Sequence, residues 1–329
     1  MDFLLDNFVA LTVTGLSLGA IYALVALGYT LVYGVLQLIN FAHSEVFMYG
    51  AFAATWTVYA MGGRAGASTG AVIGYLLAAL VAAMAFSGLI ALLLERVAYR
   101  RLRKQNAPRL IALISAIGAS FALAELMGLR DKVADFLGLG EALRPYVRGA
   151  RNSSGFPEII DTTPLFTLGD YDVTNIDLLV ITSALVMMLA LDLFVARTRF
   201  GRGIRAVAQD PESASLMGVN SDRTVQLTFL LGGLMAGAAA VLYVVKIGSI
   251  RFDTGFLLGV KAFTAAVLGG IGNLRGALLG GFVLGLAENY GSALIGTEWR
   301  DVVAFTLLVV ILLFRPTGLL GESLAKART

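Results

Sequence analysis

Residues 9–33 read VALTVTGLSLGAIYALVALGYTLVY, a run without a single charged side chain. The core of a bilayer needs about 20 apolar residues per spanning helix, and it offers no water to the backbone, so this run predicts a transmembrane helix. Further apolar runs follow along the chain, which together predict eight or nine membrane segments. They cover residues 46–60, 71–94, 110–129, 178–195, 225–245, 256–268, 277–294 and 302–314.

The composition agrees with a chain whose main solvent is lipid. Its 329 residues are 58% hydrophobic and 14% charged, with a mean hydropathy of +0.81, whereas about a quarter of a soluble domain is charged. We therefore predict an all-α, polytopic membrane bundle with a single transmembrane domain over residues 1–329. Cysteine is absent, and the acidic N-terminal residues lack the basic segment of a cleaved signal peptide.

The positions of Lys and Arg predict the orientation, because cytoplasmic loops carry an excess of both. Basic residues concentrate in loop 96–109, in loop 197–224 and in the tail from Arg315 onward. These three regions are expected to be cytoplasmic, the C-terminus included. The longest polar stretch, within residues 130–177, carries more acidic than basic residues and is expected to be external.

Two segments interrupt the apolar pattern. Residues 34–45 read GVLQLINFAHSE, and residues 268–285 read LGGIGNLRGALLGGFVLG. Short or broken hydrophobic segments in the two halves of a chain indicate the substrate pathway of a transporter. The predicted pathway residues are Asn40, His43, Ser44, Glu45, Asn273 and Glu288.

His43 is the only histidine of the chain. It could act in a proton relay because imidazole titrates near neutrality, but adjacent residues on a helix cannot give the geometry of a Ser–His hydrolase. One histidine also cannot build a usual zinc site. We expect the His43 side chain to form hydrogen bonds with the irregular backbone around it. We predict no catalytic residue, metal or cofactor.

Glycines four residues apart recur within the apolar runs. Such spacing lets helix backbones approach closely, either as ordinary packing, which is the simpler interpretation, or around a moving pathway. The predicted packing pairs are Gly233 with Gly237, Gly276 with Gly280, and Gly281 with Gly285.

Charged residues also lie within or at the ends of apolar runs. A charge at the centre of a bilayer costs at least about 2.5–3.5 kcal/mol, so it usually faces the interior of the bundle. Asp192 and Lys246 lie near segment ends and are expected to reach the headgroups. Lys261 is a third such charge, while Glu125 and Glu288 either line the pathway or neutralise a buried base.

The loop 197–224 contains a predicted short helix. Asp210 is a good N-cap residue, Pro211 and Glu212 suit a first helical turn, and Gly218 can end the helix. Such a helix could insert into a partner, although local pattern alone favours a solvated surface helix.

The residues before this helix, Arg199–Gly203, are predicted to form a turn. None of the five lysines follows a glycine, so the chain lacks a Walker A sequence. Any work driven by ATP must be done by another chain.

Four blocks of the sequence resemble LivH-type permeases of branched-chain amino-acid ABC transporters. They are the runs 15–52, 201–220 (GRGIRAVAQDPESASLMGVN), 266–288 (AVLGGIGNLRGALLGGFVLGLAE) and 312–321 (LLFRPTGLLG). The blocks occur in the expected order and cover nearly the whole chain.

The resemblance implies a transport subunit of the bacterial inner membrane rather than an enzyme, and it implies no nucleic-acid partner. The expected partners are a second permease of different sequence, two ABC ATPases and an extracytoplasmic solute-binding protein, and the expected cargo is a small amino acid. The segment 210–218 would be the helix that couples to an ATPase, through Asp210, Pro211, Glu212, Ala214 and Gly218.

Two other functions stay open at this point. Permeases for urea and short amides share the block pattern, and a secondary transporter driven by an ion gradient would have similar helices. The outer segment 138–177 is longer than the resemblance leads us to expect. It could dock the binding protein or be a tolerated insertion.

Overall fold

The structure, a computed structural model, describes residues 4, 6–105, 107–147, 149–169 and 171–321. The chain forms two compact units that interleave in sequence. The first unit comprises residues 1–37, 162–228 and 261–329, and the second comprises residues 38–161 and 229–260.

Each of the nine apolar runs forms a helix, as predicted. Within the described residues, six helical stretches are long and apolar enough to cross a membrane, whereas α3, α13 and α15 have 18, 16 and 15 residues. The described chain is thus a multi-pass helical protein. The nine helices are α2 (Phe8–Leu36), α3 (His43–Ala60), α4 (Thr69–Leu94), α6 (Arg109–Gly128), α9 (Asn175–Arg197), α12 (Ser221–Ile247), α13 (Thr254–Gly269), α14 (Leu274–Ile295) and α15 (Arg300–Phe314).

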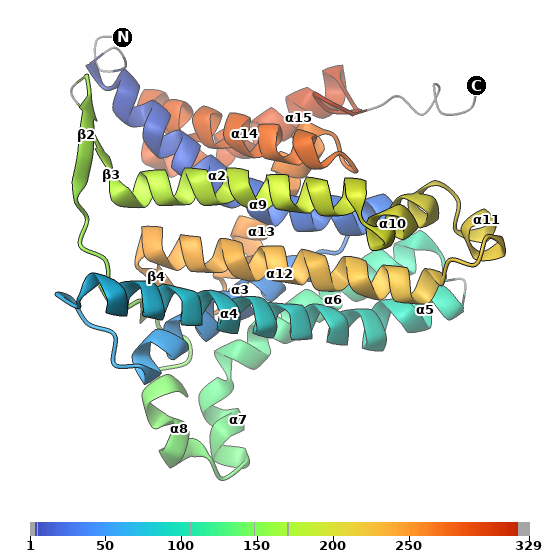
Figure 1. Cartoon of the computed structure of the whole chain (residues 1–329), viewed down its shortest axis with the longest axis horizontal. Helices are drawn as coiled ribbons and strands as arrows, with labels where there is room; N and C mark the ends of the chain where they lie inside the picture. Colours follow the sequence, from blue (N-terminus) through green and yellow to red (C-terminus); the bar gives the residue numbers. More distant parts are fainter. Residues whose placement is uncertain (1–3, 5, 106, 148, 170, 322–329) are drawn as a thin grey trace. The chain divides into compact units, whose positions relative to one another are not determined.

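The first unit is built around α2 and α14, which lie against each other in Figure 1. A Cβ atom on Gly19 would lie 2.7 Å from the carbonyl oxygen of Gly281, and one on Gly281 would lie 2.5 Å from Cβ of Ala23. Gly285 lies one turn further along α14, against Gly15 and Gly19. Side chains would therefore hold these backbones apart, so glycine sets the distance between α2 and α14.

Two other glycines of α14 face a different helix. A Cβ atom on Gly276 would meet the carbonyl oxygen of Gly269, and one on Gly280 would meet that of Ala265, both on α13. The glycines of α14 therefore form two packing faces, one for α2 and one for α13.

The second unit uses the same device on α12. Gly233 lies against Gly88 on α4, and Gly237 lies against Ala83 on α4. From α3, Gly50 also approaches Gly237, with a Cβ position only 3.1 Å from its Cα atom. Figure 1 shows α4 and α12 running side by side.

The polar stretch 130–177 contains short elements that the sequence analysis did not predict. Two-stranded antiparallel pairs form between β1 and β4 in the second unit and between β2 and β3 in the first. The second pair leads into α9 through a capping box of Thr174 and Asp177, and Ser17 of α2 donates a hydrogen bond of 2.9 Å to Asp177. The elements within this stretch are α7 (Arg130–Phe136), α8 (Gly140–Val147), β1 (Ser154–Gly155), β2 (Pro164–Leu168) and β3 (Tyr171–Thr174). The partner of β1, β4 (Ser249–Ile250), lies outside it, between α12 and α13.

The predicted turn at Arg199–Gly203 is wrong, because these residues begin the helix α10 (Arg199–Gln209). The hydroxyl of Thr198 caps this helix by accepting a hydrogen bond of 3.0 Å from the Gly201 amide. Gly201 then lets α10 pack closely on the carbonyl of Val195 at the end of α9. The glycine therefore serves a close helix contact and not a turn. The remaining helical elements are the π-helix η1 (Glu95–Tyr99), α5 (Arg100–Lys104), α11 (Pro211–Leu216) and the 3₁₀-helix η2 (Thr297–Trp299).

Candidate functional site

The predicted short helix in loop 197–224 is α11. Asp210 Oδ1 accepts hydrogen bonds from the amides of Glu212 (3.0 Å) and Ser213 (3.3 Å), and Pro211 occupies the first turn. Hydrogen bonds from the hydroxyl and amide of Ser213 and from the Glu212 amide lower the pKa of the Asp210 carboxyl. The cap therefore keeps its charge over a wider range of acidic pH than a free aspartate would.

The end of α11 is fixed as firmly as its start. Gly218 has a φ of +85°, and the next amide, that of Val219, donates a hydrogen bond of 3.0 Å to the carbonyl of Ala214. The hydroxyls of Ser215 and Ser221 lie 2.9 Å apart and link α11 to α12. Because Ala214 is buried, α11 is held against its neighbours rather than loosely solvated.

The opposite side of α11 is exposed. Leu216 and the following Met217 are 84% and 85% exposed, and Glu212 is exposed as well. Large apolar side chains this far in solvent are suited to insertion into a partner surface.

The four predicted pathway residues around the start of α3 are all buried in the second unit. The Tyr99 hydroxyl donates a hydrogen bond of 2.9 Å to Asn40 Oδ1, and the Ser44 hydroxyl donates one of 2.7 Å to the carbonyl of Phe41. The backbone amide of His43 begins the turn by bonding to the carbonyl of Asn40. Ser44 thus satisfies a carbonyl of the non-helical backbone, while Tyr99 of η1 holds the side chain of Asn40.

Glu45 is fully buried on the first turn of α3. Its Oε1 accepts hydrogen bonds from Ser120 (3.1 Å) and Ser44 (3.4 Å), while its Oε2 has no hydrogen-bond partner among the described residues. Gly255, on the first turn of α13, closes over this carboxylate, since a Cβ atom there would lie 2.6 Å from Oε2. A cationic group of a ligand could complete the coordination of this oxygen.

The other two predicted pathway residues, Asn273 and Glu288, lie in the first unit at different ends of α14. Fifteen positions separate them, so about 22 Å of helix lies between them and they cannot contact one small solute together. Asn273 caps α14 by accepting a hydrogen bond of 3.1 Å from the Gly276 amide, and its amide group donates one to Leu320.

Asn273 also lines a cavity of about 570 Å³ at that end of the first unit. Gln37, Asp192 and Arg205 contribute polar groups to the same cavity. Asp192, which we expected to reach the headgroups, forms an ion pair of 3.0 Å with Arg275.

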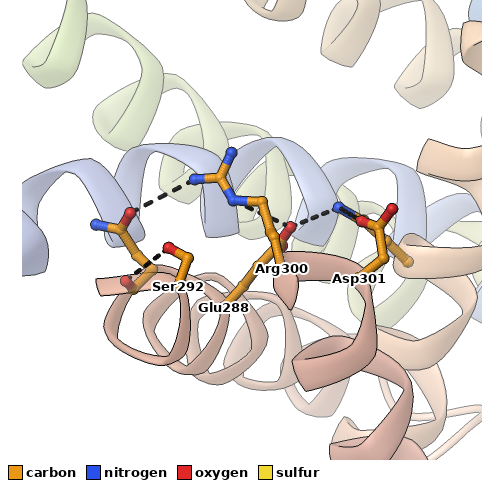
Figure 2. A network of polar contacts seen from close by, with 6 residues as sticks. Glu288, Ser292, Arg300 and Asp301 are labelled. Atoms are coloured by element: carbon orange, nitrogen blue, oxygen red, sulfur yellow. Dashed lines mark hydrogen bonds and ion pairs between the residues drawn. The ribbon is translucent and has the colours of Figure 1, made fainter. Parts of the chain in front are cut away.

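Glu288 is the centre of a charged network, which Figure 2 shows. Lys261 Nζ lies 2.5 Å from Glu288 Oε1 and 2.7 Å from Asp301 Oδ1. Arg300 Nε lies 3.4 Å from the same Glu288 oxygen, as an ion pair whose alignment falls short of a hydrogen bond. Two cations and two anions thus balance each other, and Glu288, which is fully buried, does neutralise a buried base.

Further contacts fix the edges of this network. Arg300 reaches Asn289 Oδ1 at 3.5 Å, and the Ser292 hydroxyl donates a hydrogen bond of 2.9 Å to the carbonyl of Asn289. Lys261 Nζ lies 5.9 Å from the centre of the Tyr22 ring, a favourable position for a cation. The second oxygen of Glu288 has no hydrogen-bond partner among the described residues.

Glu125, the other deep carboxylate of the sequence analysis, has a different environment. It pairs with Arg151 at 2.6 Å, and both side chains are about half exposed. Four further residues were not predicted, because each reaches a buried charge from a different element of the fold. Arg300 lies beside Glu288 and Asp301 beside Lys261. Ser120 and Gly255 lie beside Glu45.

A multi-pass bundle of apolar helices, with charges compensated inside it and a capped helix exposed on one loop, is the architecture of a membrane transport protein. Residues 11–312 match the family model described as "Branched-chain amino acid transport system / permease component". The chain therefore belongs to this family of transport permeases.

Individual relatives agree with that assignment. The chain is 42% identical over 316 residues to the permease protein BraD of the high-affinity branched-chain amino acid transport system of Pseudomonas aeruginosa, with 94% of each chain covered. It is 41% identical over 310 residues to the corresponding protein LivH of Escherichia coli K12, again with 94% of each covered. A shorter match, 33% over 138 residues, joins 40% of the chain to 41% of the autoinducer 2 import permease LsrC of Photorhabdus luminescens.

The network around Glu288 gives a test of its role. We expect Glu288→Gln or Lys261→Met alone to destabilise the protein by up to about 3–5 kcal/mol, because each leaves this buried network with one unbalanced charge. The double variant Lys261→Met/Glu288→Gln removes one charge of each sign, so its loss should be smaller than the sum of the two single losses.

Thermal unfolding of the purified protein in detergent measures these losses. Additive losses would show that the two groups are not energetically paired. If the double variant is stable and still transports, Glu288 serves the structure and does not line the pathway.

Proposed function

We propose that this chain is the membrane-spanning permease subunit of an ABC importer for leucine, isoleucine and valine in the bacterial inner membrane. The names of the relatives, which share about two-fifths of the sequence over nearly their full length, support this substrate class. They favour it over urea or short amides and over a transporter driven by an ion gradient.

The observation that carries the proposed mode of action is the geometry of α11. A helix capped at both ends, with a buried alanine on one side, exposed Glu212 and Leu216 on the other, and exposed Met217 just beyond its end, is suited to dock into a separate subunit. The proposed partners are two ABC ATPases, a second permease of different sequence and an extracytoplasmic solute-binding protein.

The proposed alternating access depends on the contacts that attach α11, through α10, to α9. When ATP closes the ATPase pair, the force on α11 would pass to α10, which is joined to α9 by the Thr198 cap, by the close contact of Gly201 and by a hydrogen bond from Arg205 to the carbonyl of Val195. Packed helices switch between discrete arrangements, so a small displacement at α11 can rock the bundle.

The proposed topology has a single transmembrane domain with eight or nine segments. In the nine-segment form α3, α13 and α15 join the six long spans, the stretch 130–177 is external, and the coupling loop 197–224 and the C-terminus are cytoplasmic. The basic residues of loops 96–109 and 197–224 support this orientation.

The proposed pathway includes Asn40, His43, Ser44 and Glu45, with Asn273 and Glu288 on α14. Among these pathway residues, Glu45 is the best supported candidate for substrate contact. Its buried second oxygen can accept a hydrogen bond from the ammonium group of an amino acid. The aliphatic side chain of the substrate would pass along apolar helix surfaces.

The coupling role of α11 can be tested by the substitution Glu212→Arg. Reversing this exposed charge should reduce both leucine uptake and ATPase stimulation about 10-fold or more, since the interface with the ATPase would gain a like-charge or unpaired contact. The control is Asp6→Arg, which reverses another exposed acidic side chain, outside both loop 197–224 and the segment 138–177. Full uptake and stimulation in Glu212→Arg would refute the coupling assignment.

The orientation can be tested by single cysteines, because the chain contains none of its own. A maleimide that does not cross membranes should label Ser153→Cys in intact spheroplasts and should label Ser213→Cys only in inverted vesicles from cells without the ATPases. Both serines are exposed. Labelling of Ser213→Cys from outside would reverse the topology.

The role of Glu45 can be tested with Glu45→Gln, which keeps the shape of the side chain. A charge-assisted hydrogen bond contributes about 1.5–3 kcal/mol, so leucine uptake by the assembled importer should fall at least about 10-fold at unchanged abundance. The control Ser120→Ala removes one hydrogen bond to the carboxylate but keeps the charge. Uptake by Glu45→Gln at the normal rate would show that Glu45 does not contact the substrate along the pathway.

A further inference from the structure

A second cavity, of about 550 Å³, lies beside α11 in the first unit. One wall comes from α10, and the other comes from the α11–α12 connection and the first turns of α12. Arg199, Arg202 and Arg223 all line it. Arg199 and Arg202 are one helical turn apart on α10, so their side chains lie on the same face.

These three arginines have no counter-ion in the described part of the chain, since none of them forms an ion pair there. Other arginines do find carboxylates, as Arg151 does with Glu125 and Arg275 with Asp192. Arginine stays charged at any physiological pH, so these three side chains keep the wall of the cavity positive. An anionic ligand would supply the counter-charge.

The rest of the lining is largely apolar. Phe200, which is 66% exposed, Val219 and Leu227 all contribute to the cavity. A small inorganic anion would use the arginines but would gain nothing from these side chains. An amphiphile with an anionic head and an apolar body would use both parts of the cavity.

We propose that this cavity binds an anionic phospholipid of the cytoplasmic leaflet, whose phosphate is held by Arg199, Arg202 and Arg223. Guanidinium groups bind phosphate oxygens through paired hydrogen bonds, and basic pockets between membrane helices on the cytoplasmic side suit lipid headgroups. The inference rests on the orientation under Proposed function, because the cavity lies where α9 ends and α12 begins.

Such a lipid would also affect the coupling helix. The cavity joins α10 to the start of α12, and these two helices flank α11 on either side in the sequence. A headgroup that bound both Arg202 and Arg223 would hold α10 and α12 together on the two sides of α11. The charge of the membrane would then influence how firmly α11 is presented to its ATPase.

The test measures lipid binding to the complete importer in vesicles of phosphatidylcholine, with or without phosphatidylglycerol. After mild detergent extraction, native mass spectrometry counts the phosphatidylglycerol that stays bound. The pocket variant Arg199→Gln/Arg202→Gln/Arg223→Gln should retain at least about 10-fold less of it than the natural chain. The variant with three lysines at these positions should retain an intermediate amount, because it keeps the charge but loses the paired hydrogen bonds.

The matched control is Arg96→Gln/Arg101→Gln/Arg109→Gln, which removes the same charge from another loop that is expected to be cytoplasmic. It should retain phosphatidylglycerol normally. Equal retention by the pocket variant and the control would overturn the proposal. So would displacement of the lipid by glycerol phosphate at equal concentration, which would indicate a site for small anions.

Loss of the ATPases from the pocket variant with unchanged lipid retention would also overturn it, and would indicate a protein interface instead. Because lipid retention is measured without transport, an error in the amino-acid assignment would leave this result unchanged. The thermal unfolding midpoint of the pocket variant confirms that the variant is folded.

Discussion

The rest of the first unit depends on the close approach of the backbones of α2 and α14. In the hydrocarbon of a bilayer there is no hydrophobic force to drive helices together, so association relies on short contacts between complementary surfaces. Gly19 on α2 and Gly281 and Gly285 on α14 provide such a surface, because any Cβ atom there would overlap the opposite helix. The position of α14 in turn sets where Glu288 and Asn273 lie.

The same helix explains how a buried charge is tolerated. Glu288 lies three positions beyond Gly285, and it meets Lys261 of α13 as well as Arg300 at the start of α15. An unpaired carboxylate at this depth would cost several kcal/mol. The contacts of Gly276 and Gly280 with α13 bring the two helices close enough for the 2.5 Å ion pair. Small residues and the charged network are therefore parts of one arrangement.

The sequence predicted what depends on local pattern. The nine apolar runs and the Asp210 cap of α11 needed only hydrophobicity, spacing and capping chemistry, and the helices lie where the runs do. The helix α10 was missed because Gly201 and Gly203 suggest a turn when read locally. In the structure, Gly201 is needed for the close contact with Val195, and that contact forms only when α10 packs against the end of α9.

The candidate sites likewise combine residues that the local sequence reveals with contacts that only the fold creates. Glu45 and Glu288 could be picked out as unusual charges, but their surroundings could not, because Ser120, Gly255 and Arg300 are brought to them only by folding. The strands β2 and β3 were missed for another reason. They are short, and β2 is exposed along its whole length, so no buried face imposes the alternation by which a strand is recognised.

The proposed coupling requires a rigid element at the contact with the ATPase, attached firmly to the helices that must move. The helix α11 has only six residues, too few to be stable alone, so its stiffness must come from the Asp210 cap, the Gly218 turn and the Ser215–Ser221 contact. Its attachment runs through α10 to the end of α9, and α9 packs on α2. Under the proposed coupling, a displacement at Glu212 would therefore pass through hydrogen-bonded and closely packed elements to the pair of helices around which the first unit is built.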